Sequence, residues 1–296
     1  MIERVEEEIA RLLEEIGYAE VTRLFTTLSG GKRLRAKLIL KIASDSQEAV
    51  KLAAIVELIH AASLLHDDVI DDARLRRGTP SVNATEGSKT AIMLGDILYS
   101  KAFSALVFFD PAIASLISGS VTALSVGEMQ DVALASRFNS DENIYLDMLY
   151  LKTASLIEAS AAAAALLVGK SSQDHALYGK NLGLSFQIID DILDIVSDEA
   201  TLGKPALNDF VEGKCTLPYI YLYHALDDND KEFLVSMHGK KISSNESEWI
   251  KSKMQQHNCV ERSFALAVKL SEEAKEVVNG DEALIAILDT MIQRSY

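Results

Sequence analysis

This sequence of 296 residues has few cysteines, few prolines and fewer basic than acidic residues. Its two cysteines, Cys215 and Cys259, cannot build a secreted disulfide framework, so we expect a reducing, cytoplasmic location. With 29 Lys and Arg against 44 Asp and Glu, the net charge of −15 excludes nucleic acid as the main partner, because a phosphate backbone needs a basic surface. Four prolines leave long stretches in which nothing interrupts a helix.

Long apolar runs are also missing. The longest run of small apolar residues, ASAAAAALLVG from Ala159 to Gly169, has about half of the length that spans a bilayer, and we interpret it as a packed interior helix. The N-terminus, MIERVEEEIARLLEE, carries early acidic residues and lacks the apolar core of a signal peptide. We therefore expect no transmembrane segment and no export.

Helix-forming residues dominate the composition. Ala, Leu, Glu, Lys and Ile are abundant, short β-type alternation is absent, and no linker composition divides the chain. We therefore expect an all-α fold in which residues 1–296 form a single all-helical domain. Apolar spacing predicts helices at 2–16, 33–43, 48–72, 90–108, 112–134, 143–168, 174–197, 216–227, 230–238, 246–256, 259–277 and 281–293.

Two copies of the pattern DDxxD stand out, each late in an apolar helix. LLHDDVIDDARLRRG and GLSFQIIDDILDIVSD contain Asp67, Asp68 and Asp71, and Asp190, Asp191 and Asp194, respectively. The first and third carboxylates of each copy lie one turn apart on one face, where they repel each other unless a cation lies between them. Carboxylate ligands favour a hard ion such as Mg²⁺, which shares phosphate oxygens with a substrate. The two clusters therefore predict a metal site and a phosphorylated substrate.

The basic residues are clustered rather than spread. Lys32 and Arg35 lie three residues apart, and Arg76 and Arg77 follow the first aspartate cluster. Each pair alone fits a solvated surface. Together with two metal clusters, they match the needs of two diphosphates, one held through Mg²⁺ and the other by lysine and arginine directly. The segment LGKPALNDFVEGKCTLP, residues 202–218, fits a phosphate-facing loop as well as a plain connection.

Five segments together resemble the trans-isoprenyl (polyprenyl) diphosphate synthases, above all the bacterial long-chain (hexaprenyl to octaprenyl) ones. They are GGKRLRAKL, LIHAASLLHDDVIDDARLRRGTPS, YLKTASLI, FQIIDDILD and GKPALNDFVEGKCTLP, and they run from about Thr27 to Pro218. The resemblance implies a helical bundle of the isoprenoid synthase type around a deep central cavity. It also implies a homodimer with about three Mg²⁺ ions in each active site. The implied reaction condenses isopentenyl diphosphate with an allylic diphosphate such as farnesyl diphosphate.

The resemblance also implies roles for individual residues. The six aspartates would hold the metals, with Asp191 supporting its neighbours. Thr153 and Gln187 would face the reacting carbons. The allylic diphosphate would be contacted by Arg76, Lys152 and Lys204, and isopentenyl diphosphate by Lys32, Arg35, His60 and Arg77, with Lys214 as a further substrate-binding residue. His66, beside the aspartates, is interpreted as a packed or capping side chain.

Product length should depend on the side chains that precede Asp67, because the growing chain extends away from the metals. Farnesyl-producing relatives commonly have aromatic residues there, whereas this chain has Ala62 and Ser63. We therefore predict products of C30 to C40, as in the side chains of respiratory quinones. Phe103 and Phe108, on a helix expected to face this one, are alternative ends of the tunnel.

Other functions remain open on the sequence alone. A short-chain farnesyl or geranylgeranyl diphosphate synthase would share every motif. Glu57 and His60 form the Glu-x-x-His of a di-iron carboxylate bundle, but no second copy is present. A terpene cyclase typically has one DDxxD and a different second metal motif, and an inactive partner subunit usually loses aspartates, which are intact here.

Overall fold

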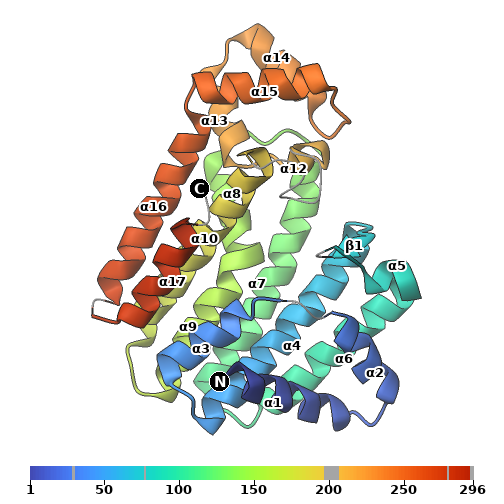
Figure 1. The fold of residues 1–296 in the computed structure, drawn as a ribbon, viewed down its shortest axis with the longest axis vertical. Coiled ribbons are helices and arrows are strands. Elements are labelled where there is room, and N and C mark those ends of the chain that lie inside the picture. The colour runs from blue at the N-terminus through green and yellow to red at the C-terminus, as the bar shows by residue number, and fades with distance from the viewer. Residues whose placement is uncertain (29–30, 77, 197–206, 279, 294–296) are drawn as a thin grey trace. The chain divides into compact units, whose positions relative to one another are not determined.

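The structure is a computed structural model that describes residues 1–28, 31–76, 78–196, 207–278 and 280–293. Helices provide nearly all of the regular structure in these ranges (Figure 1), so the predicted all-α fold class is confirmed. The chain divides into two compact units, residues 1–122 with 159–176 and residues 123–158 with 177–296. The single domain expected from the sequence stays a prediction.

The first unit is built on the amino-terminal helices. It contains α1 (Ile2–Glu14), α2 (Ala19–Thr27), α3 (Leu34–Ala43), α4 (Gln47–Ile70), β1 (Leu75–Arg76), β2 (Thr79–Pro80), α5 (Val82–Glu86) and α6 (Ser88–Leu106), with the start of α7 (Pro111–Ala135), most of α9 (Ser155–Leu167) and the first turn of α10 (Ser172–Val196). Strands β1 and β2 pair antiparallel, with Leu75 opposite Pro80 and Arg76 opposite Thr79.

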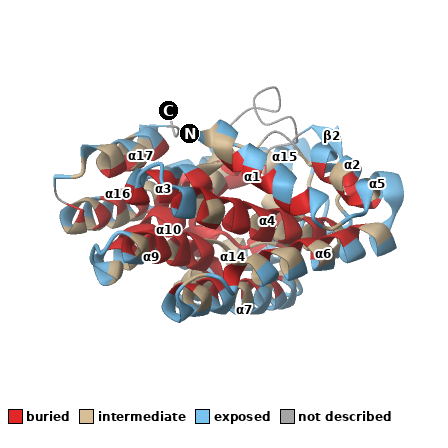
Figure 2. Cartoon of the chain, turned by 90° about the horizontal axis from the view of Figure 1, so that it is seen from below, coloured by how far each residue is buried: buried red, intermediate tan, exposed pale blue. Residues whose placement is uncertain are grey.

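Helix α4 is the core of the first unit. It begins at Ser46, whose hydroxyl accepts a hydrogen bond from Ala49 N at 3.1 Å and so satisfies one of the free amides of the first turn. Because α4 is apolar around most of its circumference, most of its residues are buried, and Figure 2 draws it mainly in red. Helices α3 and α6 both pack against it. This packing gives the polar residues at its end a fixed support.

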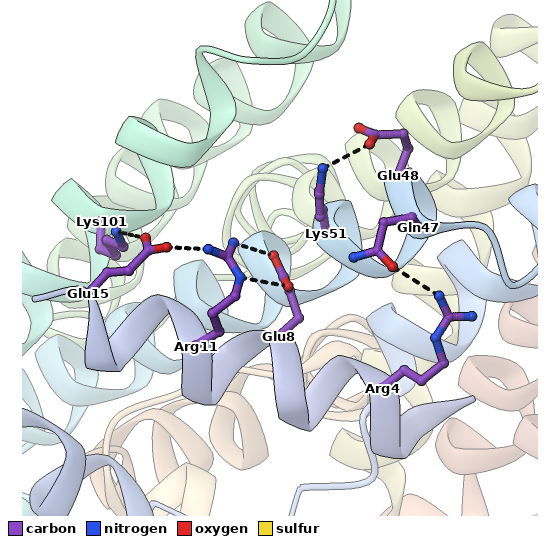
Figure 3. Close-up of polar contacts among 8 residues, drawn as sticks. All are labelled: Arg4, Glu8, Arg11, Glu15, Gln47, Glu48, Lys51 and Lys101. Atoms are coloured by element: carbon purple, nitrogen blue, oxygen red, sulfur yellow. Dashed lines mark hydrogen bonds and ion pairs between the residues drawn. The ribbon is translucent and has the colours of Figure 1, made fainter.

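A network of charged side chains covers α1 (Figure 3). Arg11 donates to the carboxylate of Glu8 at 2.7 and 3.0 Å and also pairs with Glu15, which Lys101 of α6 contacts at 2.6 Å. Arg4 donates to Gln47, at the start of α4, at 3.1 Å. Apart from Glu8 and Lys101, these groups are largely exposed, so each pair contributes little, and the buried apolar face of α1 holds it in place.

The second unit contains the remaining helices. They are the end of α7, α8 (Glu142–Leu149), the π-helical turn η1 (Tyr150–Ala154), the start of α9, most of α10, α12 (Asn208–Val211), α13 (Leu217–Ala225), α14 (Asp228–Met237), α15 (Ser244–Gln256), α16 (Cys259–Val277) and α17 (Glu282–Gln293).

Buried hydrogen bonds tie α10 to the last two helices. Tyr178 donates to Leu284 O of α17 at 2.9 Å, and Ser185 donates to Ala267 O of α16 at 2.9 Å. Both side chains are fully buried, so each polar group needs such a partner. These bonds give the last seventy residues, in which the sequence shows no motif, a structural role in supporting α10.

Two helices are long and apolar enough to cross a membrane by length and composition alone, α4 and α7. The most apolar segment of α4 is 72% buried inside the protein, and that of α7 is 33% buried. The buried face of α4 is that of a core helix. The cytoplasmic location stays a prediction.

The helices predicted from apolar spacing are found within a few residues of their expected bounds. The short helices α2, α5 and α12, the hairpin and the π turn were not predicted. The predicted helix at 143–168 is continuous in position, but η1 divides it into α8 and α9.

Candidate functional site

The first aspartate cluster forms the carboxyl end of α4. Asp67 is half-buried, Asp68 is buried, and Asp71 is exposed and ends the helix, with its amide donating to Asp67 O at 2.8 Å. Asp72 comes next in the left-handed conformation, with φ of 46°, and turns the chain back. Asp67 and Asp71 therefore lie one turn apart on one face, as the sequence predicts.

The hairpin after α4 brings Arg76 back to the cluster. The Arg76 guanidinium donates twice to Asp68 Oδ1, from Nε at 2.8 Å and from Nη2. Asn83 also donates to Asp68 O at 3.1 Å, which fixes the helix end from the other side. Asp67 and Asp71 have the one-turn spacing that suits a shared cation, whereas Asp68 pairs with Arg76.

Helix α3 starts at the basic segment, and a buried glutamate of α4 caps it. Glu57, 3% exposed, accepts from Ala36 N at 3.0 Å and from Arg33 Nη1 at 3.2 Å. Arg33 has φ of 49°, so the backbone turns sharply between Lys32 and Arg35 before the helix begins. Lys32 is exposed and Arg35 half-buried, both in the first unit, as is His60, one turn after Glu57. Each oxygen of Glu57 therefore accepts a hydrogen bond from the start of α3.

His66 faces α6 rather than the aspartates. Its Nε2 lies 3.2 Å from Ile92 O and 3.4 Å from Asp96 Oδ1, and the ring packs against Gly95 and Tyr99. Interpreting it as a packed side chain therefore agrees with its contacts.

The side chains predicted to control product length lie in the same unit. Ala62 is fully buried and Ser63 half-buried. On α6, Phe103 stacks on Tyr99 with ring centroids 6.1 Å apart. Phe108 is 86% exposed, so within this chain it does not close a tunnel.

The second aspartate cluster lies in α10, in the second unit. Asp191 and Asp194 are buried and Asp190 is half-buried. Asp194 Oδ2 accepts from Asp209 N at 3.1 Å. Asp191 accepts from Gln187 Nε2 at 3.0 Å and from the hydroxyl of Tyr145, and Thr153 donates to Gln187 Oε1 at 3.3 Å. Burial, and then the charge of Asp209, raise the pKa of Asp191 to about 8, although both hydrogen-bond donors lower it.

Lys152 pairs with two acidic residues of α7. Its ammonium lies 2.8 Å from Glu128 Oε2 and 2.5 Å from Asp131 Oδ2. Burial is the largest influence and lowers the pKa of Lys152, but the charges and hydrogen bonds of Asp131 and Glu128 together raise it above its ordinary value. Lys152 is therefore a fixed positive charge, and an incoming anion has to compete with two carboxylates for it.

Two glycines allow neighbouring helices to pack directly on the π turn that carries Lys152 and Thr153. A Cβ at Gly127 of α7 would lie 2.7 Å from Leu151 C, and one at Gly183 of α10 would lie 2.6 Å from Ala154 Cα. The backbones of α7 and α10 therefore both touch η1, at distances that any side chain would prevent. Single π turns inside α-helices often mark functional sites.

Of the three remaining residues predicted to bind substrate, the structure describes only Lys214. Lys214 is half-buried and lies 3.1 Å from Glu212 Oε2, and its amide donates to Asp209 O at 2.8 Å. Arg77 and Lys204 lie outside the described residues, and their roles stay predictions.

Sequence reasoning missed Glu128, Asp131, Tyr145 and the structural role of Glu57. A signal was present for the first two, because acidic residues three apart on an apolar helix share one face. Tyr145 gives no such signal, because its partner Asp191 is 46 residues away.

The two clusters are chemically suited to a hard divalent cation. Every candidate ligand is a carboxylate oxygen, and Asp67 with Asp71 and Asp190 with Asp194 have the one-turn spacing. Among the described residues, no three such side chains already converge closely enough to hold an ion. Substrate phosphate oxygens and water would therefore have to complete the coordination.

Comparison with known proteins gives one family. Residues 19–255 match the family described as Polyprenyl synthetase. A short chain isoprenyl diphosphate synthase of Methanothermobacter thermautotrophicus is 36% identical over 99% of this chain and 95% of that protein. Heptaprenyl diphosphate synthase component 2 of Geobacillus stearothermophilus is 33% identical over 93% of this chain and 88% of that protein. The octaprenyl pyrophosphate synthase structure from Helicobacter pylori aligns with a TM-score of 0.94 at 40% identity, covering 100% and 98% of the two chains.

Proposed function

Because the chain belongs to the polyprenyl synthetase family and is a trans-prenyltransferase, we propose that it extends an allylic diphosphate, such as farnesyl diphosphate, with isopentenyl diphosphate to all-trans products of C30 to C40. The observation that supports the chain length is the small size of Ala62 and of the half-buried Ser63, about one turn before the first aspartate cluster, where farnesyl-producing relatives commonly have aromatic residues. Small side chains there leave room for a long isoprenoid tail.

The proposed site uses Mg²⁺ held by Asp67 and Asp71 and by Asp190 and Asp194. When bound, the metal neutralises the charge that develops on the leaving diphosphate. Arg76, held by Asp68, and Lys152, held by Glu128 and Asp131, supply positive charge to the allylic diphosphate. Lys204 would contribute as well.

The second diphosphate has its own proposed site at the start of α3. Lys32 and Arg35, with His60 and Arg77, would hold isopentenyl diphosphate directly, without a metal. Thr153 and Gln187, joined by a hydrogen bond, would face the reacting carbons. An apolar, water-free environment is required there, because water would capture an allylic cation.

A homodimer is the proposed assembly. One face of α7 carries three exposed apolar side chains, Val126 (42% exposed), Met129 (74%) and Val132 (51%). In the most apolar segment of this helix, only 33% is buried. An exposed apolar stripe of this kind marks a contact surface. A second copy of the chain is the occupant that the family resemblance implies.

The similar proteins are named for products of different lengths, so a short-chain synthase is a second candidate function. The Methanothermobacter thermautotrophicus relative is named as a short chain enzyme, whereas the Helicobacter pylori structure is of an octaprenyl synthase. The stacked Tyr99 and Phe103 favour the short product if they end the tunnel. Use of the product for quinone side chains is part of the first proposal.

The decisive experiment incubates the protein with Mg²⁺, farnesyl diphosphate and radiolabelled isopentenyl diphosphate and measures product length. Products of C30 to C40 support the proposal. A product that stops at C20 or below supports the short-chain candidate. No incorporation of label would favour an inactive subunit.

A further inference from the structure

A single chain of hydrogen bonds links three elements of the second unit. Thr153 of η1 donates to Gln187 Oε1 at 3.3 Å, and Gln187 Nε2 donates to Asp191 Oδ1 at 3.0 Å. At the far end, the Tyr145 hydroxyl of α8 donates to Asp191 Oδ2. Asp191 is the central acceptor, because each of its two oxygens receives one of these donors.

The chain determines which way the Gln187 amide points. Asp191 Oδ1 accepts from Gln187 Nε2 and Asp191 Oδ2 from the Tyr145 hydroxyl, so Gln187 presents its NH₂ group to Asp191 and its carbonyl oxygen to Thr153. Without a firmly held Asp191, the amide could rotate and present NH₂ instead. The negative end of an amide dipole stabilises a nearby carbocation, whereas the positive end opposes it.

Tyr145 has a hydroxyl that packing alone does not require. The side chain is 2% exposed, and a phenylalanine would fill nearly the same space. A buried hydroxyl costs free energy unless it is hydrogen-bonded. Here it donates to Asp191, in the middle of the second aspartate cluster, and accepts from the backbone amide of Leu217. Tyr145 therefore contacts the site from behind, without being placed to touch a substrate.

We propose that Tyr145 is a positioning residue of the prenyl transfer reaction. Through Asp191, it holds the Gln187 carbonyl toward Thr153 and the reacting carbons, and it keeps the Asp191 carboxylate directed away from the metal positions of Asp190 and Asp194. The inference rests on the proposed function, in which Thr153 and Gln187 face those carbons.

The test is Tyr145→Phe, which removes one oxygen atom and keeps the ring. We expect kcat for the first condensation with farnesyl diphosphate to fall at least ~10-fold, because a misdirected amide dipole acts on the transition state. The KM values of both substrates should stay within about twofold, because neither diphosphate contacts this chain of bonds. An unchanged kcat, or a rise in KM with kcat unchanged, would overturn the inference.

A double-mutant cycle separates positioning from general damage. In a Gln187→Leu background, Tyr145→Phe should lower kcat no further, because the group that it orients is gone. Independent, multiplying losses would refute the inference.

Tyr178→Phe is the matched control, because Tyr178 is also fully buried and donates one hydrogen bond, to Leu284 O at 2.9 Å. We expect both variants to lower the melting temperature, but only Tyr145→Phe to lower kcat. An equal loss of kcat in both would show a merely structural role. Since turnover is counted for one condensation, a short wild-type product would refute the proposed chain length and leave this inference standing.

Discussion

The carboxylate of Glu57 reaches from the middle of α4 to the guanidinium of Arg33, 3.2 Å away, and also accepts from Ala36 N. One buried acid therefore fixes both the left-handed residue before α3 and the first turn of that helix. The basic residues proposed to hold isopentenyl diphosphate, Lys32 and Arg35, lie on either side of this contact.

Glu57→Gln should consequently weaken binding of isopentenyl diphosphate. The amide keeps the shape but loses the buried one of the two charges that hold Arg33, the other being Glu6 at 2.7 and 3.0 Å. We therefore expect the KM for isopentenyl diphosphate to rise about tenfold, as for a lost charge-assisted hydrogen bond. The KM for the allylic substrate should not change. Glu48→Gln is the control, because Glu48 is an exposed residue of the same helix, paired with Lys51 at 3.0 Å. Equal effects of the two variants would contradict the assignment.

Asp67→Asn and Asp190→Asn should each lower kcat at least ~10³-fold, through lost charge stabilisation of the leaving group. EDTA should abolish product formation, and added Mg²⁺ should restore it. The control is Asp72→Asn, since Asp72 is exposed and lies after the cluster, outside the helix. Full activity in EDTA would refute the metal proposal, and so would either of the first two variants at wild-type rates.

Gly183→Ala should damage both stability and turnover. The added methyl would lie 2.6 Å from Ala154 Cα, so α10 or η1 has to move, at a cost of ~1–3 kcal/mol. The same substitution at Gly119, where nothing lies within 4 Å, should be neutral or stabilising by up to ~1 kcal/mol. Chemical denaturation and kcat measured on both proteins decide the matter. A Gly183→Ala protein that matches Gly119→Ala would mean that η1 tolerates displacement.

Ala62→Tyr should shorten the product toward farnesyl or geranylgeranyl diphosphate, because a close-packed interior has no room for both an aromatic ring and a passing chain. Phe108→Ala should leave product length unchanged, since Phe108 is 86% exposed. Chromatography of dephosphorylated products measures both. An unaltered distribution in Ala62→Tyr would remove Ala62 from the tunnel.

Met129→Glu should dissociate the proposed dimer, because it places a charge on the apolar stripe of α7. Gln130→Glu adds the same charge at the neighbouring exposed position and should leave the dimer intact. Light scattering on both variants provides the measurement. A wild-type protein that is monomeric and fully active would disprove the assembly.

The long helices and the two DDxxD patterns could be predicted because their signals are local. Apolar periodicity gives α4 and α10, and residues four apart on a helix share a face wherever the helix lies. The hairpin of β1 and β2 could not be predicted, because two-residue strands are too short to show alternation. The contact of Arg76 with Asp68 depends on this hairpin, so it could not be predicted either.

Partners distant in sequence account for the other omissions. The sequence pairs Glu57 with His60, three residues away, whereas its contacts are with Arg33 and Ala36 on another helix. Tyr145 and Asp191 are 46 residues apart, and nothing local in either segment indicates the other. Such pairings depend on tertiary packing, which periodicity does not encode.

The π turn at residues 150–154 sets the helical phase of α9, the helix that continues from it. One extra residue in a turn rotates every later side chain by about 100° relative to an uninterrupted α-helix. The alanine-rich run of α9 therefore faces a direction that depends on this single insertion. Deleting one residue between Leu149 and Lys152 would leave both DDxxD patterns, the lysine and the threonine intact in the sequence, and would still turn α9 by a quarter of a revolution or so. A search for motifs would accept such a chain as active, although its helices would be out of phase.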